Sequence, residues 1–437
     1  MDERLIVLMG GVVAGTLSRL DNNLLRLAYD DTYRGSAGAT PISVSLPLAI
    51  KTHSDTPAQR TVSNFLWGLL PDNDLVLTRW SQHYQVRSTS PFFLLGTPVG
   101  QDCAGAVTFC PPGDLDRHLS RRGSIEWLSV QQVADLLRDL RRDQTTWLGQ
   151  DFAGHFSLAG AQAKTALVLS NGRWGRPSGA TPTTHILKPK GASFADQDVN
   201  EHLCLAAAAK AGLVTVRSQI VTFGDETAIV VARYDRRRLR GGRVARVHQE
   251  DACQALGIHP ASKYENAGGP GVADISRLIR RVMPPRDANR AVWRFADGLI
   301  WNWLIAGTDA HAKNYSLLLG GSQVRFAPLY DITSILPYIG QRLSDGVVLH
   351  ERRLKMAMRI GGDYDLWPVR NPWVRAAKEL GLQVDALLDR VRALATSAPS
   401  AFVAVASDST AKQLQSPVTE QLVTRVRERS SRCLAVL

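Results

Sequence analysis

Cysteine motifs that bind metal are missing from this sequence of 437 residues. None of its cysteines forms a C-x-x-C pair or stands at a zinc-site spacing from a histidine. The five cysteines are Cys103, Cys110, Cys204, Cys253 and Cys433. An odd and dispersed set argues against a zinc module and predicts reduced thiols, which is what we expect of a cytoplasmic protein.

Long uncharged apolar runs are missing too. No such run reaches the roughly 18 residues that a membrane-spanning helix needs, so we expect no contact with a membrane. The segment 5–18 is the nearest candidate for a signal-peptide core. It follows Asp2 and Glu3 rather than a basic region, and Gly10-Gly11 interrupts it. Apolar flanks around two glycines predict a β-hairpin instead.

Acidic residues are scarce in the C-terminal two-thirds of the chain. The net charge is +12, yet residues 1–150 carry 14 Lys and Arg against 15 Asp and Glu. Residues 151–437 carry 38 against 25. This excess favours an anionic partner there, such as nucleotide phosphate, nucleic acid or an acidic protein, although solvated arginines explain any single cluster equally well.

The remaining composition is that of a folded protein: 44% hydrophobic and 21% charged residues, and a length sufficient for two or three domains. Apolar periodicity predicts β-rich structure over residues 1–60, including a strand over 41–48, and helices within 61–87. A linker is expected over 111–123. Helices are predicted over 130–142, 200–213, 272–306 and 372–396. The part before residue 150 shows no chemically suggestive cluster, so it is either a docking module or a lid that completes the core of the next domain.

The stretch 301–331 carries the strongest chemical pattern. Asp309 is followed five positions later by Asn314, and Asp331 comes after two strand-like apolar runs. In protein kinases the same Asp-x-x-x-x-Asn spacing provides a base for the acceptor hydroxyl and a metal ligand, and a later Asp completes the metal site. Chance matches to this spacing are common, and a loop with local turn hydrogen bonds is the alternative.

Upstream residues match the same chemistry, each weakly when taken alone. The segment 155–172 is predicted to form strand, tight turn and strand, and the small side chains of Ala159-Gly160-Ala161 would let backbone amides approach phosphates. Lys188 lies on a predicted strand, and Glu201 in the first turn of a helix is placed to meet it. An ordinary β-turn and a solvent-facing lysine are the alternatives. His248 is interpreted as a structural histidine.

The roles of two further segments stay open. The apolar run 228–232 predicts a buried strand that ends where a kinase hinge would present backbone groups to adenine. The arginine-rich segment 236–246 either faces an anionic partner or forms a solvated hairpin tip around Gly241-Gly242.

These motifs together resemble the HipA-type serine/threonine kinases, the toxin half of bacterial toxin–antitoxin pairs. The resemblance rests on seven ordered motifs and covers nearly the full length. They are SLAGAQAKTAL (157–167), THILKP (184–189), NEHLCL (200–205), ARYDR (232–236), HQEDACQALG (248–257), GTDAHAKNYSLLL (307–319) and APLYDI (327–332).

The resemblance implies an α+β, two-lobed kinase-like fold related to phosphatidylinositol kinases, with a small β-rich N-terminal subdomain and a helical C-lobe. The implied boundaries are residues 1–112 for the N-terminal subdomain, 113–232 for the kinase N-lobe with the linker, and 233–437 for the C-lobe.

The resemblance also implies a site for ATP and Mg²⁺. Asp309 matches the catalytic base, and Asn314 and Asp331 match the metal ligands. The implied ATP-binding residues are Ala159, Gly160, Ala161, Gln162, Ala163 and Lys164 of the phosphate loop, Lys188, the hinge residues Ala232, Arg233 and Tyr234, the ribose contact Asp235, and His311, Lys313 and Asn314. Ser157 matches a serine that some members autophosphorylate, which ejects the phosphate loop and stops the kinase.

Two positions depart from the family pattern. The loop usually reads AGAQEK, but position 163 is Ala, which puts loop stability or regulation in question. The hinge usually begins with Glu and here begins with Ala232, where only the backbone is expected to matter. All metal and base positions are kept, so the sequence predicts an active kinase.

The partners are implied by the resemblance alone. They are a protein substrate of the translation machinery, such as glutamyl-tRNA synthetase, a helix-turn-helix antitoxin of HipB type, and operator DNA reached through the antitoxin complex. Two other functions stay open: a catalytically silent DNA-associated co-repressor, and a small-molecule phosphotransferase that shares the Asp-x-x-x-x-Asn spacing.

Overall fold

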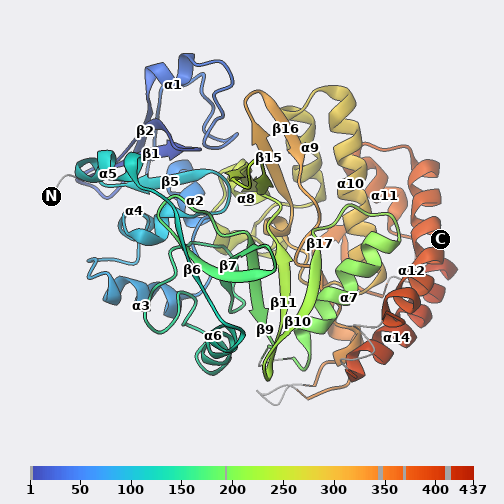
Figure 1. Cartoon of the computed structure of the whole chain (residues 1–437). Coiled ribbons are helices and arrows are strands. Elements are labelled where there is room, and N and C mark those ends of the chain that lie inside the picture. Colours follow the sequence, from blue (N-terminus) through green and yellow to red (C-terminus); the bar gives the residue numbers. More distant parts are fainter. Residues whose placement is uncertain (1–2, 192–193, 343–347, 368–370, 409–414) are drawn as a thin grey trace.

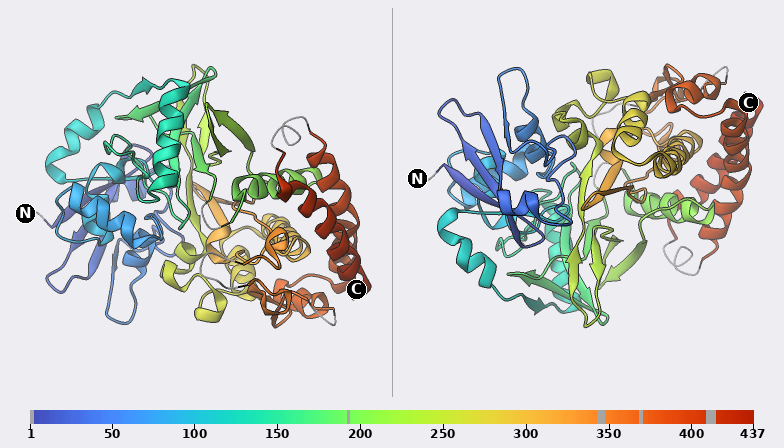
Figure 2. Two further views of the ribbon diagram at one scale, coloured as in Figure 1. Left: turned by 90° about the horizontal axis from the view of Figure 1, so that it is seen from below. Right: turned by 90° about the horizontal axis from the view of Figure 1, so that it is seen from above.

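A computed structural model of the chain describes residues 3–191, 194–342, 348–367, 371–408 and 415–437. The N-terminal residues form one side of the molecule and the C-terminal helices the other, with β-sheets between them (Figure 1). Both views in Figure 2 show the same order of layers. No helix in the described ranges is long and apolar enough to cross a membrane. The five cysteines are free thiols, and all are buried.

The N-terminal part is built on a five-stranded antiparallel sheet in the order β4-β3-β2-β1-β5. Its strands are β1 (Arg4–Met9), β2 (Val12–Arg19), β3 (Leu25–Tyr29), β4 (Thr52–Ser54) and β5 (Val107–Cys110). The predicted hairpin is confirmed: Gly10 and Gly11 have φ values of 59° and 89°, which two-residue hairpin turns require and glycine adopts without strain.

Short helices cover this sheet. They are α1 (Asp31–Gly35), α2 (Thr61–Trp67), α3 (Asp74–His83), α4 (Pro91–Leu95) and the 3₁₀ helix η1 (Pro98–Gln101). The strand predicted over 41–48 is wrong, because this segment holds only an isolated bridge between Ser43 and Leu46. The Tyr29 hydroxyl accepts a hydrogen bond from the Ile42 amide and donates one to the Leu46 carbonyl. A side chain thus satisfies backbone groups that a strand would pair.

The expected linker over 111–123 is also partly helical. It contains η2 (Pro112–Asp114) and α5 (Leu115–Ser120) before the chain enters a second sheet. That sheet has six strands in the order β10-β11-β9-β7-β8-β6. They are β6 (Ser124–Trp127), β7 (Thr165–Ser170), β8 (Arg173–Ser178), β9 (His185–Pro189), β10 (Ser218–Phe223) and β11 (Glu226–Ala232).

A helix covers each face of the second sheet. Helix α6 (Val130–Arg142) has the predicted bounds and begins with a capping box between Ser129 and Gln132. It packs on alternate residues of β11, including Val230. The intervening residues, such as Ile229, face α7 (Gln197–Lys210) and the C-terminal helices.

The C-terminal part begins with three short strand pairings and three short helical segments. These elements are β12 (Arg236–Arg238), β13 (Val244–Arg246), β14 (His248–Asp251), α8 (Ala252–Leu256), η3 (Pro260–Ser262), η4 (Glu265–Ala267), β15 (Ser316–Gly320) and β16 (Gln323–Phe326). Strands β14, β15 and β16 form a three-stranded sheet. The strand-like runs predicted between Asn314 and Asp331 are therefore β15 and β16.

Helices make up most of the remaining chain. They are α9 (Val272–Val282), α10 (Pro285–Leu304), α11 (Trp373–Leu380), α12 (Val384–Ala406) and α14 (Pro417–Ala435), with η5 (Ala312–Asn314), η6 (Leu336–Tyr338), η7 (Glu351–Arg353) and the hairpin of β17 (Lys355–Ile360) and β18 (Asp363–Asp365). Helix α10 lies in the core, where Trp301 and Trp303 are almost fully buried. The overall mixture of helices and sheets confirms the predicted α+β class.

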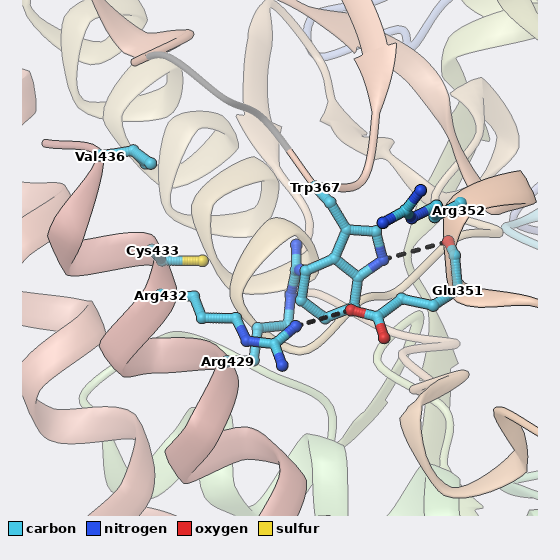
Figure 3. Close-up of a pocket in the computed structure, with 7 residues that line it drawn as sticks. All are labelled: Glu351, Arg352, Trp367, Arg429, Arg432, Cys433 and Val436. Atoms are coloured by element: carbon cyan, nitrogen blue, oxygen red, sulfur yellow. Dashed lines mark hydrogen bonds and ion pairs between the residues drawn. The ribbon is translucent and has the colours of Figure 1, made fainter.

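Helix α14 is fixed to this core by a buried arginine. The Arg429 guanidinium donates hydrogen bonds to the carbonyls of Trp303 and Leu366 and lies 4.2 Å from the ring centroid of Trp367. Figure 3 shows it beside a cavity of about 380 Å³. At the rim Arg432 pairs with Glu351 at 2.7 Å.

The arginines of the β12–β13 hairpin fall into two groups, one paired with Asp102 and one exposed to solvent. Arg236 and Arg246 bind Asp102 of the N-terminal part at 2.9 and 3.0 Å. Arg237, Arg238, Arg240 and Arg243 are exposed around the glycine turn. The segment is thus partly an internal ionic contact and partly a solvated tip.

The N-terminal part docks onto β14 through buried polar groups. Glu250 is fully buried, and its carboxyl accepts hydrogen bonds from the Ser43 hydroxyl at 2.5 Å and the Val44 amide at 2.8 Å. His248 accepts from the Ala106 amide and bonds the Ile42 carbonyl, which agrees with the predicted structural histidine. Burial raises the pKa of Glu250 to about 8, so this contact holds a neutral carboxyl group at neutral pH.

Glu250→Gln should therefore change how stability depends on pH. A raised folded-state pKa means that the protonated group stabilises the fold fully below its ordinary pKa of 4.5 and that this stability is lost as pH rises to about 8. We expect nearly equal stability of both proteins at pH 4 and a gain of about 2–4 kcal/mol for the variant at pH 9. Urea unfolding at both pH values measures this. The exposed Glu126→Gln is the control, and equal stability at pH 9 would contradict the prediction.

Candidate active site

Between the six-stranded sheet and the β14–β16 sheet lies a cleft of about 290 Å³. It gathers fifteen of the seventeen residues that the sequence singled out. They are Ala159, Gly160, Ala161, Gln162, Lys164, Lys188, Ala232, Arg233, Tyr234, Asp235, Asp309, His311, Lys313, Asn314 and Asp331. The other two, Ser157 and Ala163, are buried beside it.

Lys188 is the centre of the charged contacts in this cleft. Its ammonium group donates to both carboxylate oxygens of Glu201, at 2.8 and 2.9 Å, and to Asp331 Oδ1 at 2.8 Å. Lys188 lies on β9, Glu201 in the second turn of α7 and Asp331 beyond β16, so the contact joins three elements. The predicted meeting of Lys188 and Glu201 is confirmed.

The protonation states follow from this geometry. Burial opposes the charge on Lys188, but the two carboxylates outweigh it and raise the pKa of the lysine. Lys188 in turn lowers the pKa of Asp331 to about 2. Burial raises the pKa of Glu201, against the attraction of Lys188. The cluster therefore holds a charged lysine between a buried carboxyl group and a second carboxylate that is open to solvent.

The loop between α10 and β15 presents Asp309. The Asn314 side-chain amide donates to the Asp309 carbonyl at 3.0 Å, and the His311 amide donates to the same oxygen at 2.8 Å. These bonds fix the backbone and leave the Asp309 carboxylate exposed. Its Oδ1 accepts a hydrogen bond from the Tyr264 hydroxyl at 2.6 Å.

Asp331 has a strained backbone. Its φ of 54° lies in the left-handed region, which is uncommon for a residue with a side chain and occurs often at functional sites. Its side chain is 43% exposed, although Oδ1 binds Lys188. No described residue donates a hydrogen bond to Oδ2, so this oxygen is available to a ligand.

The oxygen donors suit a magnesium ion. Asn314 keeps its amide oxygen and Asp331 its second carboxylate oxygen, and Mg²⁺ prefers such hard ligands. Among the described residues, no three His, Cys, Asp or Glu side chains are grouped as a metal site. A site with one or two protein ligands fits Mg²⁺, which completes its shell with water and phosphate oxygens, better than it fits zinc.

The phosphate loop differs from the prediction. The expected first strand is absent, because β7 begins only at Thr165 and residues 156–164 form an irregular loop. Within it, Gly160 has a φ of 103°. The Lys164 ammonium donates to the Ala159 carbonyl at 3.2 Å and lies 4.1 Å from the Trp147 ring centroid. Burial, with Lys188 nearby, lowers the pKa of Lys164 to about 7.

Ser157 anchors this loop in the interior. It is fully buried, its hydroxyl donates to the Leu69 carbonyl at 2.8 Å, and its amide donates to the Asp102 carbonyl at 3.1 Å. Both acceptors belong to segments that precede the six-stranded sheet. The loop is thus held in the cleft by the N-terminal part of the chain.

The hinge segment follows β11. Tyr234 stacks on Tyr330, with ring centroids 5.6 Å apart, and forms an aromatic wall of the cleft. The Arg233 amide donates to the Thr184 carbonyl. The Asp235 carboxylate accepts from the Gly105 amide at 2.7 Å and pairs with Arg233 and Arg236. The predicted ribose contact would have to share this carboxylate and stays a prediction.

Three residues in the cleft were not predicted from the sequence: Asp72, Lys263 and Tyr264. Asp72 binds Lys263 at 3.0 Å and Lys313 at 2.5 Å, and its amide donates to the Gly160 carbonyl. It lies 241 positions before Lys313, so no local pattern connects the two. Pro71 marks a turn at this point, but a turn does not indicate where it will dock.

Comparison with known families agrees with the site. A family model of the HipA-like C-terminal domain matches residues 156–402, and a model of the HipA N-terminal domain matches residues 5–110. The chain belongs to the HipA family. The domain boundaries expected at residues 112 and 232 stay predictions.

Individual relatives cover almost the whole chain. The Y4mE protein of Sinorhizobium fredii, whose name gives kinase activity as an inference, is 32% identical over 413 residues, 91% of each chain. The serine/threonine-protein kinase toxin HipA of Shewanella oneidensis is 28% identical over 409 residues, 91% of this chain and 88% of the relative.

A solved structure shares the fold. It is the complex of HipA, HipB and operator DNA from Shewanella oneidensis, whose matching chain superimposes with a TM-score of 0.78. The match covers 99% of this chain and 100% of the other, at 25% identity. The fold is therefore that of a HipA kinase toxin, whereas the expected relation to phosphatidylinositol kinases stays a prediction.

Removing the cation from the central cluster should destabilise the protein. Lys188→Met leaves the Glu201 carboxyl buried without its partner, so we expect a loss of about 2–4 kcal/mol in the free energy of unfolding. The double variant Lys188→Met, Glu201→Leu should recover most of this loss, because an apolar pair replaces the buried ion pair. Urea unfolding tests both. A single variant as stable as the native protein would contradict this account of the cluster.

Proposed function

We propose that the protein transfers the γ-phosphoryl group of ATP to a serine or threonine of another protein, with Mg²⁺ as cofactor. The observation that carries this proposal is the Lys188 cluster, in which one ammonium group joins Glu201 and Asp331 in the cleft that also holds Asp309 and Asn314. This is the arrangement that positions ATP phosphates in protein kinases.

Binding of ATP would use two ends of the cleft. Tyr234 and Tyr330 offer an aromatic surface for adenine, and the hinge backbone from Ala232 to Asp235 borders it. Lys188 and the loop 159–164 would contact the phosphates, together with His311 and Lys313, which line the same cleft. Asn314 and Asp331 would hold Mg²⁺, which neutralises phosphate charge when bound.

Asp309 would act on the acceptor. Its carboxylate is exposed to the cleft and its backbone is fixed by Asn314 and His311, so it can orient an incoming hydroxyl group and accept its proton. The other residues of the cleft would position the reactants and stabilise charge, because phosphoryl transfer needs little covalent catalysis.

The biological role follows the family. We propose that the protein is a growth-arresting toxin whose substrate belongs to the translation machinery, such as glutamyl-tRNA synthetase. The solved relative is bound to HipB and operator DNA, which supports a helix-turn-helix antitoxin and DNA contact through it for this chain. We propose a cytoplasmic location for the same reason.

Asp309→Gln should abolish phosphoryl transfer and leave ATP binding intact, because it removes the base but not the phosphate contacts. The expected loss is about 10²–10⁴-fold. Labelled ATP, Mg²⁺ and a cell lysate measure transfer, and calorimetry measures ATP binding. The same assay separates the alternatives, since a co-repressor labels nothing and a small-molecule phosphotransferase labels no protein. Unchanged labelling of protein by the variant would remove Asp309 from this role.

Ser157 should become phosphorylated when the protein is incubated with ATP and Mg²⁺, and the modified protein should lose ATP affinity. Ser157 is buried against Leu69, so a phosphate carrying about −1.5 to −2 charges cannot return with the loop to its place. Peptide mapping by mass spectrometry locates the phosphate, with Ser157→Ala as control. A modified protein that still binds ATP as tightly would contradict this switch.

A further inference from the structure

A tyrosine hydroxyl is hydrogen-bonded to Asp309, as the hydroxyl group of a phosphoryl acceptor would have to be. Tyr264 lies between η3 and η4, and its Oη donates to Asp309 Oδ1 at 2.6 Å. Both residues line the cleft that contains Lys188 and Asp331. The contact therefore lies in the proposed active site, on a side of it that is open to solvent.

The tyrosine is held in a defined orientation. Its ring packs edge-on against His311, with centroids 5.0 Å apart, and the Gly269 amide donates to its carbonyl at 2.9 Å. The preceding residue, Lys263, binds Asp72. Burial and the hydrogen bond to Asp309 raise the pKa of Tyr264, so the phenol keeps its proton at neutral pH.

The geometry fits a phosphoryl acceptor. A general base must lie within hydrogen-bonding distance of the proton that it removes, and the Tyr264 hydroxyl meets this condition at Asp309. Ser157 does not, because its hydroxyl is buried and donates to the Leu69 carbonyl. In the conformation described here, the Tyr264 hydroxyl is thus already hydrogen-bonded to the proposed catalytic carboxylate.

We propose that Tyr264 is a site of phosphorylation within the same molecule. The inference rests on the proposed kinase activity. The Tyr264 oxygen would form a bond to the γ-phosphorus of ATP, the bond from that phosphorus to the bridging oxygen would break, the phenolic proton would pass to Asp309, and ADP would leave with the bond electrons.

The surroundings would hold the product. A phosphate on Tyr264 adds about −1.5 to −2 charges beside Lys263, which now shares Asp72 with Lys313. The new phosphate would compete with Asp72 for these two ammonium groups. It would also stand at Asp309, so the modified molecule cannot admit another acceptor hydroxyl and stops phosphorylating other proteins.

Peptide mapping of the full-length protein tests the proposal. The protein is incubated with ATP and Mg²⁺ in the presence of casein as a general protein acceptor, digested with trypsin, and the peptide 264–277 is sequenced by mass spectrometry. We expect phosphate on Tyr264 in the native protein and in Tyr364→Phe, which changes a tyrosine on β18 outside the cleft. We expect at least about 10²-fold less in Asp309→Ala.

A mixing experiment separates the intramolecular reaction from an exchange between molecules. Native protein is incubated with Asp309→Ala protein that carries a heavy-isotope label. Only the unlabelled peptide 264–277 should gain phosphate, and the modified fraction should not change on dilution. Phosphate on the labelled peptide would overturn the intramolecular assignment.

The outcomes distinguish the two proposals. If casein or Ser157 gains phosphate while Tyr264 does not, the inference is wrong and the proposed function stands. If no protein gains phosphate, the proposed function fails and the inference fails with it.

A measurement without nucleotide tests the contact itself. Tyr264 should react slowly with tetranitromethane in the native protein, because its phenol is half-buried and bound to Asp309. Asp309→Ala removes the acceptor and should raise the nitration rate of Tyr264 several-fold, leaving that of Tyr364 unchanged. Equal rates at Tyr264 in both proteins would overturn the contact on which the proposal depends.

Discussion

The contact of Lys188 with Glu201 and Asp331 is the constraint on which the rest of the site depends. Each partner comes from a different element: a strand of the six-stranded sheet, the second turn of α7, and the loop after the β14–β16 sheet. Buried charges are costly unless they are paired, so the three elements must close on one another for any of them to be stable. The pairing holds the six-stranded sheet and the loop after the β14–β16 sheet at a fixed separation, and the cleft lies between them.

The N-terminal part takes a direct share in this site. It supplies Asp72 to Lys263 and Lys313, the Leu69 carbonyl to Ser157, and Ser43 to the neutral carboxyl of Glu250. These contacts agree with the expectation that this part completes the core of the next domain, whereas a docking role stays a prediction. Any movement of this part would separate Asp72 from Lys313 and Leu69 from Ser157, so it would alter the cleft and the anchoring of the loop 156–164 together.

Two aspartates in the cleft show how one residue type can take different roles. Asp331 is bound by Lys188 in a strained backbone and keeps one oxygen for a ligand, which suits a metal site. Asp309 has an exposed carboxylate whose partner is a neutral phenol, which suits an exchange of protons. The spacing of the two aspartates in the sequence does not predict this difference. The difference arises from the side chains that the fold places beside each aspartate.

The sequence by itself determined the helices with strong periodicity, the hairpin at Gly10-Gly11, and the residues of the catalytic loop, because these depend on neighbours within a few positions. It also predicted the pairing of Lys188 with Glu201, since a strand followed by a helix restricts where the two can meet. Only the tertiary structure decided that residues 41–48 are not a strand, that Asp235 is held by Arg233 and Arg236, and that Asp72 and Tyr264 enter the cleft. Those outcomes depend on partners far away in the chain, and no local pattern of residues records which distant group will satisfy a given charge or hydrogen bond.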